Sequence, residues 1–205
     1  THRYDNLTSV YLTDHVGKWF KEQVAAHPEA KLRVGLVHYN IFSGSSHQDD
    51  EMGPLLRASL LPIMKECDID IVLQGHDHCY EVMGPVDNNV DAPAPIMEAI
   101  AEREVVSTSE SMSGYKGGTY TVDNGTLYFI GATCGDKRYD PYTKEEMEAD
   151  INKHKVENYF DIFTGMFCQP KDPSYTALSV KGATITFKSY KVDENGNSNL
   201  FNNSL

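Results

Sequence analysis

The stretch Ile71–Glu81, IVLQGHDHCYE, passes from an apolar run directly into two histidines that are one residue apart. A short apolar run that is bounded by a glycine predicts a buried β-strand over Ile69–Leu73, followed by a turn. In an extended segment, side chains two residues apart point to the same side of the chain. We therefore expect His76 and His78 to bind one metal ion or two neighbouring metal ions. Neutral imidazole suits Zn, Mn, Fe or Ni.

A second strand and a helix lie upstream of this stretch. The run Leu32–Val37, LRVGLV, predicts a strand, and apolar residues recur with helical spacing across residues 50–67. Strand, helix and strand in this order predict a βαβ unit with two parallel strands and a right-handed crossover. Ligands of such sheets bind beyond the carboxyl ends of the strands. Because His38 follows the first strand, we expect His38, His76 and His78 at one edge of the sheet.

The rest of the chain divides into a helical start and a β-rich end. Helical periodicity covers residues 12–26, and an irregular excursion is expected over residues 84–118, with a short helix near 96–104. Downstream, the pattern predicts a strand at 126–132, a mixed helical stretch at 144–160, strands at 175–180 and 184–192 that turn at Lys181-Gly182, and another turn at Asn195-Gly196. The expected fold class is therefore α/β, a βαβ unit with a C-terminal β-rich part.

Composition excludes some functions. The chain has 205 residues, of which 40% are hydrophobic, and its formal net charge is −12. This length suits one substantial domain or part of a larger one. An acidic surface repels nucleic acid and acidic lipid, so we expect neither as a partner. No apolar run is long enough to span a membrane. The four cysteines show no Cys-x-x-Cys spacing, which favours buried thiols over disulfides.

Three blocks carry a resemblance to a known family. GHDHCYE resembles the Gly-His-x-His block of calcineurin-like metallophosphoesterases, and its Tyr-Glu is similar to the purple acid phosphatase branch. LVHYNIFSGSSH resembles that branch's strand-end histidine and the Ser/Tyr-rich loop after it. TLYFIGATCGDK resembles a later block, in which a strand runs into a Gly-rich turn beside the site. The resemblance spans Trp19 to Val192 and implies a four-layer α/β/β/α sandwich.

The resemblance also implies roles for individual residues. His38 and His76 would bind one metal ion and His78 the other, and a bridging hydroxide would attack the phosphorus of a phosphate ester. The two ions would be Fe, Zn or Mn. His47 matches a histidine that faces the substrate phosphate, so it is a candidate general acid or phosphate contact. The alternative for His47 is a solvated loop histidine. Asp77, between two candidate ligands, is expected to have a structural role or to orient the metal ligands, rather than to bind metal itself.

The family's remaining metal ligands come from Asp-x-His, Gly-Asp and Gly-Asn-His blocks that precede the histidine matched by His38. None of them occurs ahead of His38, and Gly135-Asp136 lies after GHDH. The interpretation is that residues 1–205 are the C-terminal portion of such a domain, half of the sandwich, inactive alone and holding no metal ion or one weakly bound ion. The two parallel strands should then expose an edge, which favours a homodimer or strand exchange.

Two other functions stay open. One is a degenerate, non-catalytic module that binds a metal ion or a partner. The other is a mononuclear hydrolase built from His38, His76, His78 and a local carboxylate. For the parent protein, the resemblance implies a phosphate-ester substrate and an exported or cell-surface location.

Overall fold

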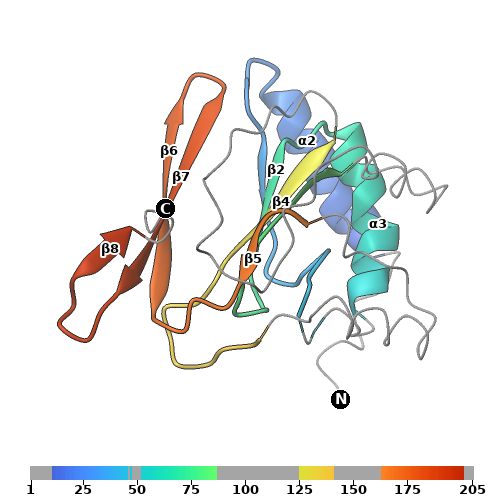
Figure 1. Cartoon of the computed structure of the whole chain (residues 1–205). Coiled ribbons are helices and arrows are strands. Elements are labelled where there is room, and N and C mark those ends of the chain that lie inside the picture. The colour runs from blue at the N-terminus through green and yellow to red at the C-terminus, as the bar shows by residue number, and fades with distance from the viewer. Residues whose placement is uncertain (1–10, 46, 48–51, 87–124, 141–162, 201–205) are drawn as a thin grey trace.

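The structure is a computed structural model, and it describes residues 11–45, 47, 52–86, 125–140 and 163–200. Figure 1 shows helices against one side of a central sheet and a separate hairpin sheet on the other side. The elements in chain order are η1 (a π-helix, Leu12–Gly17), α2 (Lys18–Ala26), β1 (Val34–Leu36), α3 (Met52–Glu66), β2 (Ile71–Gln74), β3 (Tyr80–Val86), β4 (Thr126–Gly131), β5 (Phe163–Cys168), β6 (Ser174–Lys181), β7 (Thr184–Val192) and β8 (Ser198–Leu200).

The predicted βαβ unit is confirmed. β1 pairs in parallel with β2, with Val34 opposite Ile71 and Leu36 opposite Leu73, and α3 is the connecting helix. β2 also pairs in parallel with β4, whereas β3 is antiparallel to both β4 and β5. The five strands lie in the order β1-β2-β4-β3-β5. Three strands, β1, β2 and β4, therefore run in one direction and end at one edge.

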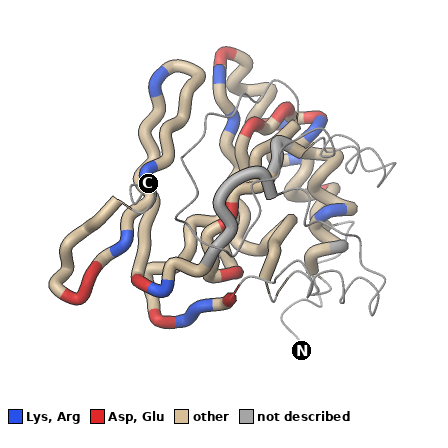
Figure 2. The backbone as a smooth tube through the Cα atoms, viewed as in Figure 1, with Lys and Arg blue, Asp and Glu red and all other residues tan. Residues whose placement is uncertain are grey.

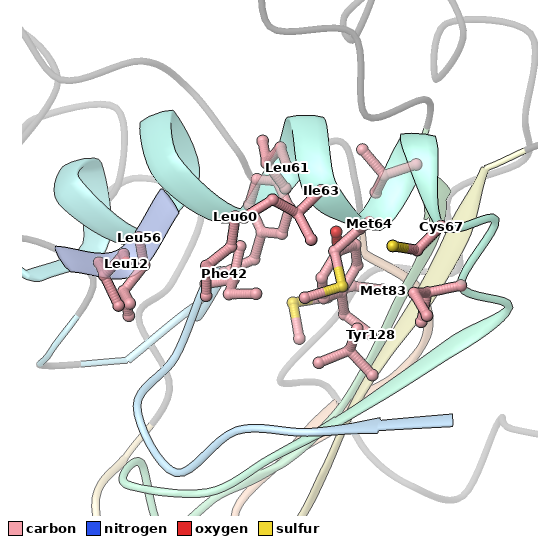
Figure 3. Close-up of a cluster of buried hydrophobic side chains, with 14 of the residues drawn as sticks. Leu12, Phe42, Leu56, Leu60, Leu61, Ile63, Met64, Cys67, Met83 and Tyr128 are labelled. Atoms are coloured by element: carbon pink, nitrogen blue, oxygen red, sulfur yellow. The ribbon is translucent and has the colours of Figure 1, made fainter. Parts of the chain in front are cut away.

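The pleat of the five-stranded sheet divides its apolar side chains between two cores. Val72, Tyr128 and Met83 lie in register across β2, β4 and β3, and they belong to the core under the helices. Figure 3 shows Met83 and Tyr128 beneath α3, whose Leu60 and Met64 point toward them. Gly17 lets η1 approach α3 closely, since a Cβ atom there would lie 2.5 Å from Ile63 Cδ1.

The opposite face of this sheet packs against the second sheet. β6, β7 and β8 form a three-stranded antiparallel sheet, and its Ile185 and Phe187 pack on a core that contains Ile71 and Phe129. The Phe129 and Phe187 rings lie 4.8 Å apart. Tyr80, which is 5% exposed, accepts a hydrogen bond from Ser189 across the two sheets. The α/β class and the β-rich C-terminal part are confirmed as three layers, one helical and two of sheet.

The sequence-based boundaries hold for most elements, but β3, β5 and β8 had no predicted strand. The helices at 12–26 and 50–67 and the strands at 126–132, 175–180 and 184–192 are confirmed within a few residues. The predicted start of the irregular excursion at residue 84 was wrong, because β3 continues through Gly84-Pro85 to Val86. A register shift between Met83 and Val86 accommodates this dipeptide. β5 was missed. The helices expected near 96–104 and 144–160 lie outside the described residues.

The turns and thiols follow the predictions in part. Gly182 and Gly196 have φ values of 63° and 81°, which suits glycine at the two predicted turns. Cys67 and Cys79 are free and buried, whereas Cys134 is free but exposed. Among the described residues, no helix is long and apolar enough to cross a membrane.

Charged residues are concentrated on the helices and the connections, and the central strands are largely uncharged (Figure 2). β1, which lies at one end of the five-stranded sheet, is poorly buried. β1 has a strand partner on one side in the described part of the chain, and its Val34 and Leu36 are 40% and 77% exposed. An exposed apolar edge strand is a surface on which another strand can add.

We propose that this edge causes self-association. Leu36→Lys should weaken it, because a charge on an edge strand opposes strand addition, whereas Gln23→Lys on the exposed face of α2 adds the same charge elsewhere. Sedimentation velocity over a concentration series should show a concentration-dependent dimer for the unaltered chain and for Gln23→Lys, but a monomer for Leu36→Lys. A monomer at every concentration for the unaltered chain would contradict the proposal.

Candidate metal and phosphate-binding site

The parallel pairing of β1 and β2 brings the first two candidate ligands together. His38 follows β1 and His76 follows β2, and their ring centroids lie 5.4 Å apart. The backbone N–H of Gly75 donates to the His38 carbonyl at 3.1 Å, so the two chains remain paired just past the strand ends. The expected convergence of His38 and His76 at one sheet edge is confirmed as geometry. Their role as ligands stays a prediction.

The segment between His76 and His78 is not extended, contrary to the expectation. His76 has a φ of 66°, in the left-handed region that non-glycine residues rarely occupy. Its ring contacts Tyr39 at 4.7 Å, whereas the His78 ring contacts Tyr139 at 5.3 Å. The turn at His76 thus gives the two imidazoles different neighbours. Two histidines one residue apart share a side only where the backbone is extended.

His47 joins the first pair of histidines. Its ring centroid lies 4.2 Å from that of His76, and its side chain is 23% exposed. Its Nε2 atom is 3.8 Å from Oδ1 of Asp77. The His47 ring is therefore packed beside a candidate ligand, with its Nε2 atom buried, and its role toward a phosphate stays a prediction.

Asp77 is fully buried, and its carboxylate accepts hydrogen bonds from buried side chains. Its Oδ2 accepts a hydrogen bond from Asn40 Nδ2 at 2.9 Å and another from the Ser43 hydroxyl. A carboxylate with two such donors is held in place by the loop after β1. This arrangement agrees with the structural role that we expected for Asp77.

His78 is oriented by the segment after β4. Its Nδ1 lies 2.7 Å from the Lys137 carbonyl oxygen. Because a carbonyl oxygen can only accept, Nδ1 is the donor, and in the neutral form of the imidazole the lone pair lies on Nε2. Metal-binding histidines usually have their second nitrogen held in this way. The protonation pattern of His78 therefore fits a metal ligand.

Residues 137–140 are part of the site, and the TLYFIGATCGDK block ends at the first of them. The Tyr139 ring lies 4.9 Å from His47 and 5.3 Å from His78. The Gln169 side chain donates to the carbonyls of both His78 and Tyr139, at 2.7 and 2.6 Å. Sequence reasoning missed Tyr139, because its place in the site depends on β4 pairing in parallel with β2, which brings the residues after β4 to the same sheet edge.

The side chains at this site are of the types that bind metal ions, but too few of them lie close together. Neutral imidazoles are suitable ligands for Zn, Fe or Mn. Within the described ranges, however, no three side chains of His, Cys, Asp or Glu lie close enough together to hold an ion. The described residues therefore supply imidazoles for a metal site without completing one.

Two ionisable groups lie buried behind the histidines. The pKa of Glu81 is raised to about 8, chiefly by burial and also by the nearby Asp77 carboxylate, against the lowering effect of the hydrogen bonds from Cys79 and Gly44. Burial and Glu81 also raise the pKa of the Cys79 thiol well above its usual value. Glu81 is thus largely uncharged at neutral pH.

Comparisons with known proteins gave a sequence match and a structural alignment. The chain is 34% identical over 61 residues to purple acid phosphatase 3 of Arabidopsis thaliana, a match that covers 30% of this chain and 16% of the relative. A solved purple acid phosphatase, PPD1 from yellow lupin (Lupinus luteus) seeds, aligns with a TM-score of 0.49 and 15% identity. That alignment covers 89% of this chain and 27% of the lupin chain. No family model matches the chain.

The sequence match confirms that the chain resembles the purple acid phosphatases. It also shows that the chain spans a minor part of the relative's length.

The raised pKa of Glu81 makes a prediction about stability against pH. The folded state holds this proton more strongly than the unfolded state, whose carboxyl titrates near its ordinary value of 4.5. The free energy of unfolding should therefore fall as pH rises from about 4.5 to about 8 and then level off, by up to a few kcal/mol, since a tenfold difference in proton affinity corresponds to ~1.4 kcal/mol. Glu81→Gln should remove this slope. Urea denaturation between pH 5 and 9 measures it, and parallel curves for the two proteins would contradict the assignment.

A second prediction follows from the positive φ of His76. A non-glycine residue in the left-handed region costs ~1 kcal/mol, which glycine does not incur. Both His76→Ala and His76→Gly lose the imidazole, so their difference reports the backbone alone. We expect His76→Gly to be more stable than His76→Ala by about 1 kcal/mol in chemical denaturation. A more stable alanine variant would show that His76 is not held in this conformation in solution.

Proposed function

We propose that this chain is the C-terminal portion of a metal-dependent phosphoesterase that hydrolyses phosphate esters. The observation that carries the proposal is the gathering of His38, His47 and His76 at one sheet edge. His78 is held by the Lys137 carbonyl and packs on the same Tyr139 ring that contacts His47. The sequence match to a purple acid phosphatase supports the same class. On this proposal the chain is inactive alone.

The histidines would divide between two metal ions. His38 and His76 would hold one ion and His78 the other, and the ions would be Fe, Zn or Mn. When bound, they would supply the electrophilic activation that phosphate-ester hydrolysis requires. Carboxylate ligands would come from a longer polypeptide, since the buried Asp77 is already occupied by Asn40 and Ser43. Alone, this chain would hold one weakly bound ion or none.

His47 would act on the substrate. Its side chain is partly exposed, and its ring packs on His76, so a phosphate group bound at the histidines would lie within its reach. A protonated imidazole can contact the phosphate or give its proton to the leaving oxygen. Tyr139 packs edge-on against His47 and would limit how far that ring can rotate.

A second candidate is a non-catalytic module that binds a metal ion or a partner. The incomplete ligand set in the described residues favours it. The two candidates differ in the native gene, because the catalytic proposal requires upstream Asp-x-His and Gly-Asn-His blocks. For the catalytic protein we propose a phosphate-ester substrate and an exported or cell-surface location, with no nucleic-acid or membrane partner.

The test compares this chain with a longer polypeptide from the same gene. In the longer protein, His76→Ala and His78→Ala should each lose bound metal and p-nitrophenyl phosphate hydrolysis. His47→Ala should keep the metal but lower turnover by ~10²–10⁴-fold, the usual contribution of general acid catalysis. Metal content is measured by mass spectrometry, with His27→Ala as the control because that imidazole is 63% exposed on a turn. Activity that survives His76→Ala or His78→Ala would overturn the proposal.

A further inference from the structure

The loop that leads from β1 to His47 is buried although it is not part of a sheet or helix. We call residues 40–45 the His47 loop. Ile41, Phe42, Ser43 and Ser45 in it are at most 2% exposed. A buried loop needs partners for its backbone N–H and carbonyl groups, because water cannot reach them. The regular pairing of β1 with β2 ends before this loop begins.

Gln74, the last residue of β2, supplies partners for the middle of the loop. Its Oε1 accepts hydrogen bonds from the backbone N–H groups of Ile41 and Phe42, at 2.6 and 3.3 Å. Its Nε2 donates to the Phe42 carbonyl at 3.1 Å. One side-chain amide thus satisfies three backbone groups, as a neighbouring strand would.

Glu81 and Asp77 hold the rest of the loop. The Glu81 carboxyl group accepts from the Gly44 backbone N–H, at 3.1 and 3.3 Å to its two oxygens, and from the Cys79 thiol at 2.7 Å. Asp77 binds the side chains of Asn40 and Ser43. Opposite these groups, Arg57 of α3 donates to the Ile41 carbonyl at 2.9 Å.

The three side chains come from one segment, residues 74–81, which also carries His76 and His78. The His47 loop is therefore attached to the candidate ligands themselves. We propose that Gln74 and Glu81 are positioning residues, which hold the His47 loop so that the His47 ring stays against His76. Both act through the loop backbone, to which their hydrogen bonds run. The inference rests on the proposed function for the reaction that this positioning serves.

The first test removes the amide of Gln74 while keeping its length. Gln74→Met should leave far-UV circular dichroism unchanged but speed amide exchange of Ile41 and Phe42 about tenfold or more, which corresponds to ~1.4 kcal/mol. The nuclear Overhauser contact between the His47 and His76 rings should disappear. The matched control is Gln23→Met, on the exposed face of α2, which should change neither readout. Unchanged exchange and an intact ring contact in folded Gln74→Met would overturn the role of Gln74.

A pair of variants at Glu81 decides the matter if Gln74→Met does not fold. Glu81→Gln keeps a neutral acceptor for the Gly44 N–H, so protection of that amide and the contact between His47 and His76 should persist. Glu81→Leu has nearly the same volume without an acceptor, and both should be lost. If Glu81→Leu keeps the ring contact, the positioning role is wrong. If Glu81→Gln loses it while remaining folded, the hydrogen bond to Gly44 is not what holds the loop.

The longer polypeptide separates positioning from metal binding. Gln74→Met should lower kcat for p-nitrophenyl phosphate about tenfold or more, with unchanged metal content and little change in KM, and Gln23→Met should match the unaltered protein. A fall in metal content equal to the fall in kcat would overturn positioning as the cause. The spectroscopic contacts do not depend on activity. Their failure would refute the inference and leave the phosphoesterase proposal standing, whereas an inactive longer protein with intact contacts would refute that proposal alone.

Discussion

The parallel pairing of β1 with β2 is the constraint on which the rest of the site depends. It places Leu36 opposite Leu73, so both strands end at the same level and release their next residues at one edge. His38 and His76 become neighbours for this reason. Since β4 pairs in parallel on the other side of β2, the segment that carries Lys137 and Tyr139 reaches the same edge.

Two kinds of burial support this edge. Apolar side chains fill both faces of the five-stranded sheet, under α3 on one side and under the second sheet on the other. At the strand ends, side chains form hydrogen bonds with the buried backbone of the loop, because buried backbone groups without partners are costly. Gln74, Asp77 and Glu81 meet that requirement. Glu81 remains largely uncharged at neutral pH because it lies in this interior, which raises its pKa.

The failures of sequence-based prediction have identifiable causes. No strand was predicted where β3 lies, because Gly84-Pro85 normally breaks a strand, and here a register shift absorbs it. The extended geometry expected for His76 and His78 was wrong because His76 adopts a positive φ, which no local pattern of IVLQGHDHCYE announces. Tyr139 was missed because its relevance depends on β4 lying beside β2.

By itself, the sequence determined the βαβ unit, the C-terminal hairpins and the meeting of His38 with His76, because apolar periodicity and strand direction are local properties of the chain. Only the tertiary structure decided which neighbours each imidazole has. The packing of the His47 loop on residues 74–81 placed His47 on His76, and the carbonyl of Lys137 fixed the protonated nitrogen of His78. These contacts join segments that lie far apart in the chain, and their geometry follows from hydrogen bonds between segments, which no single segment encodes.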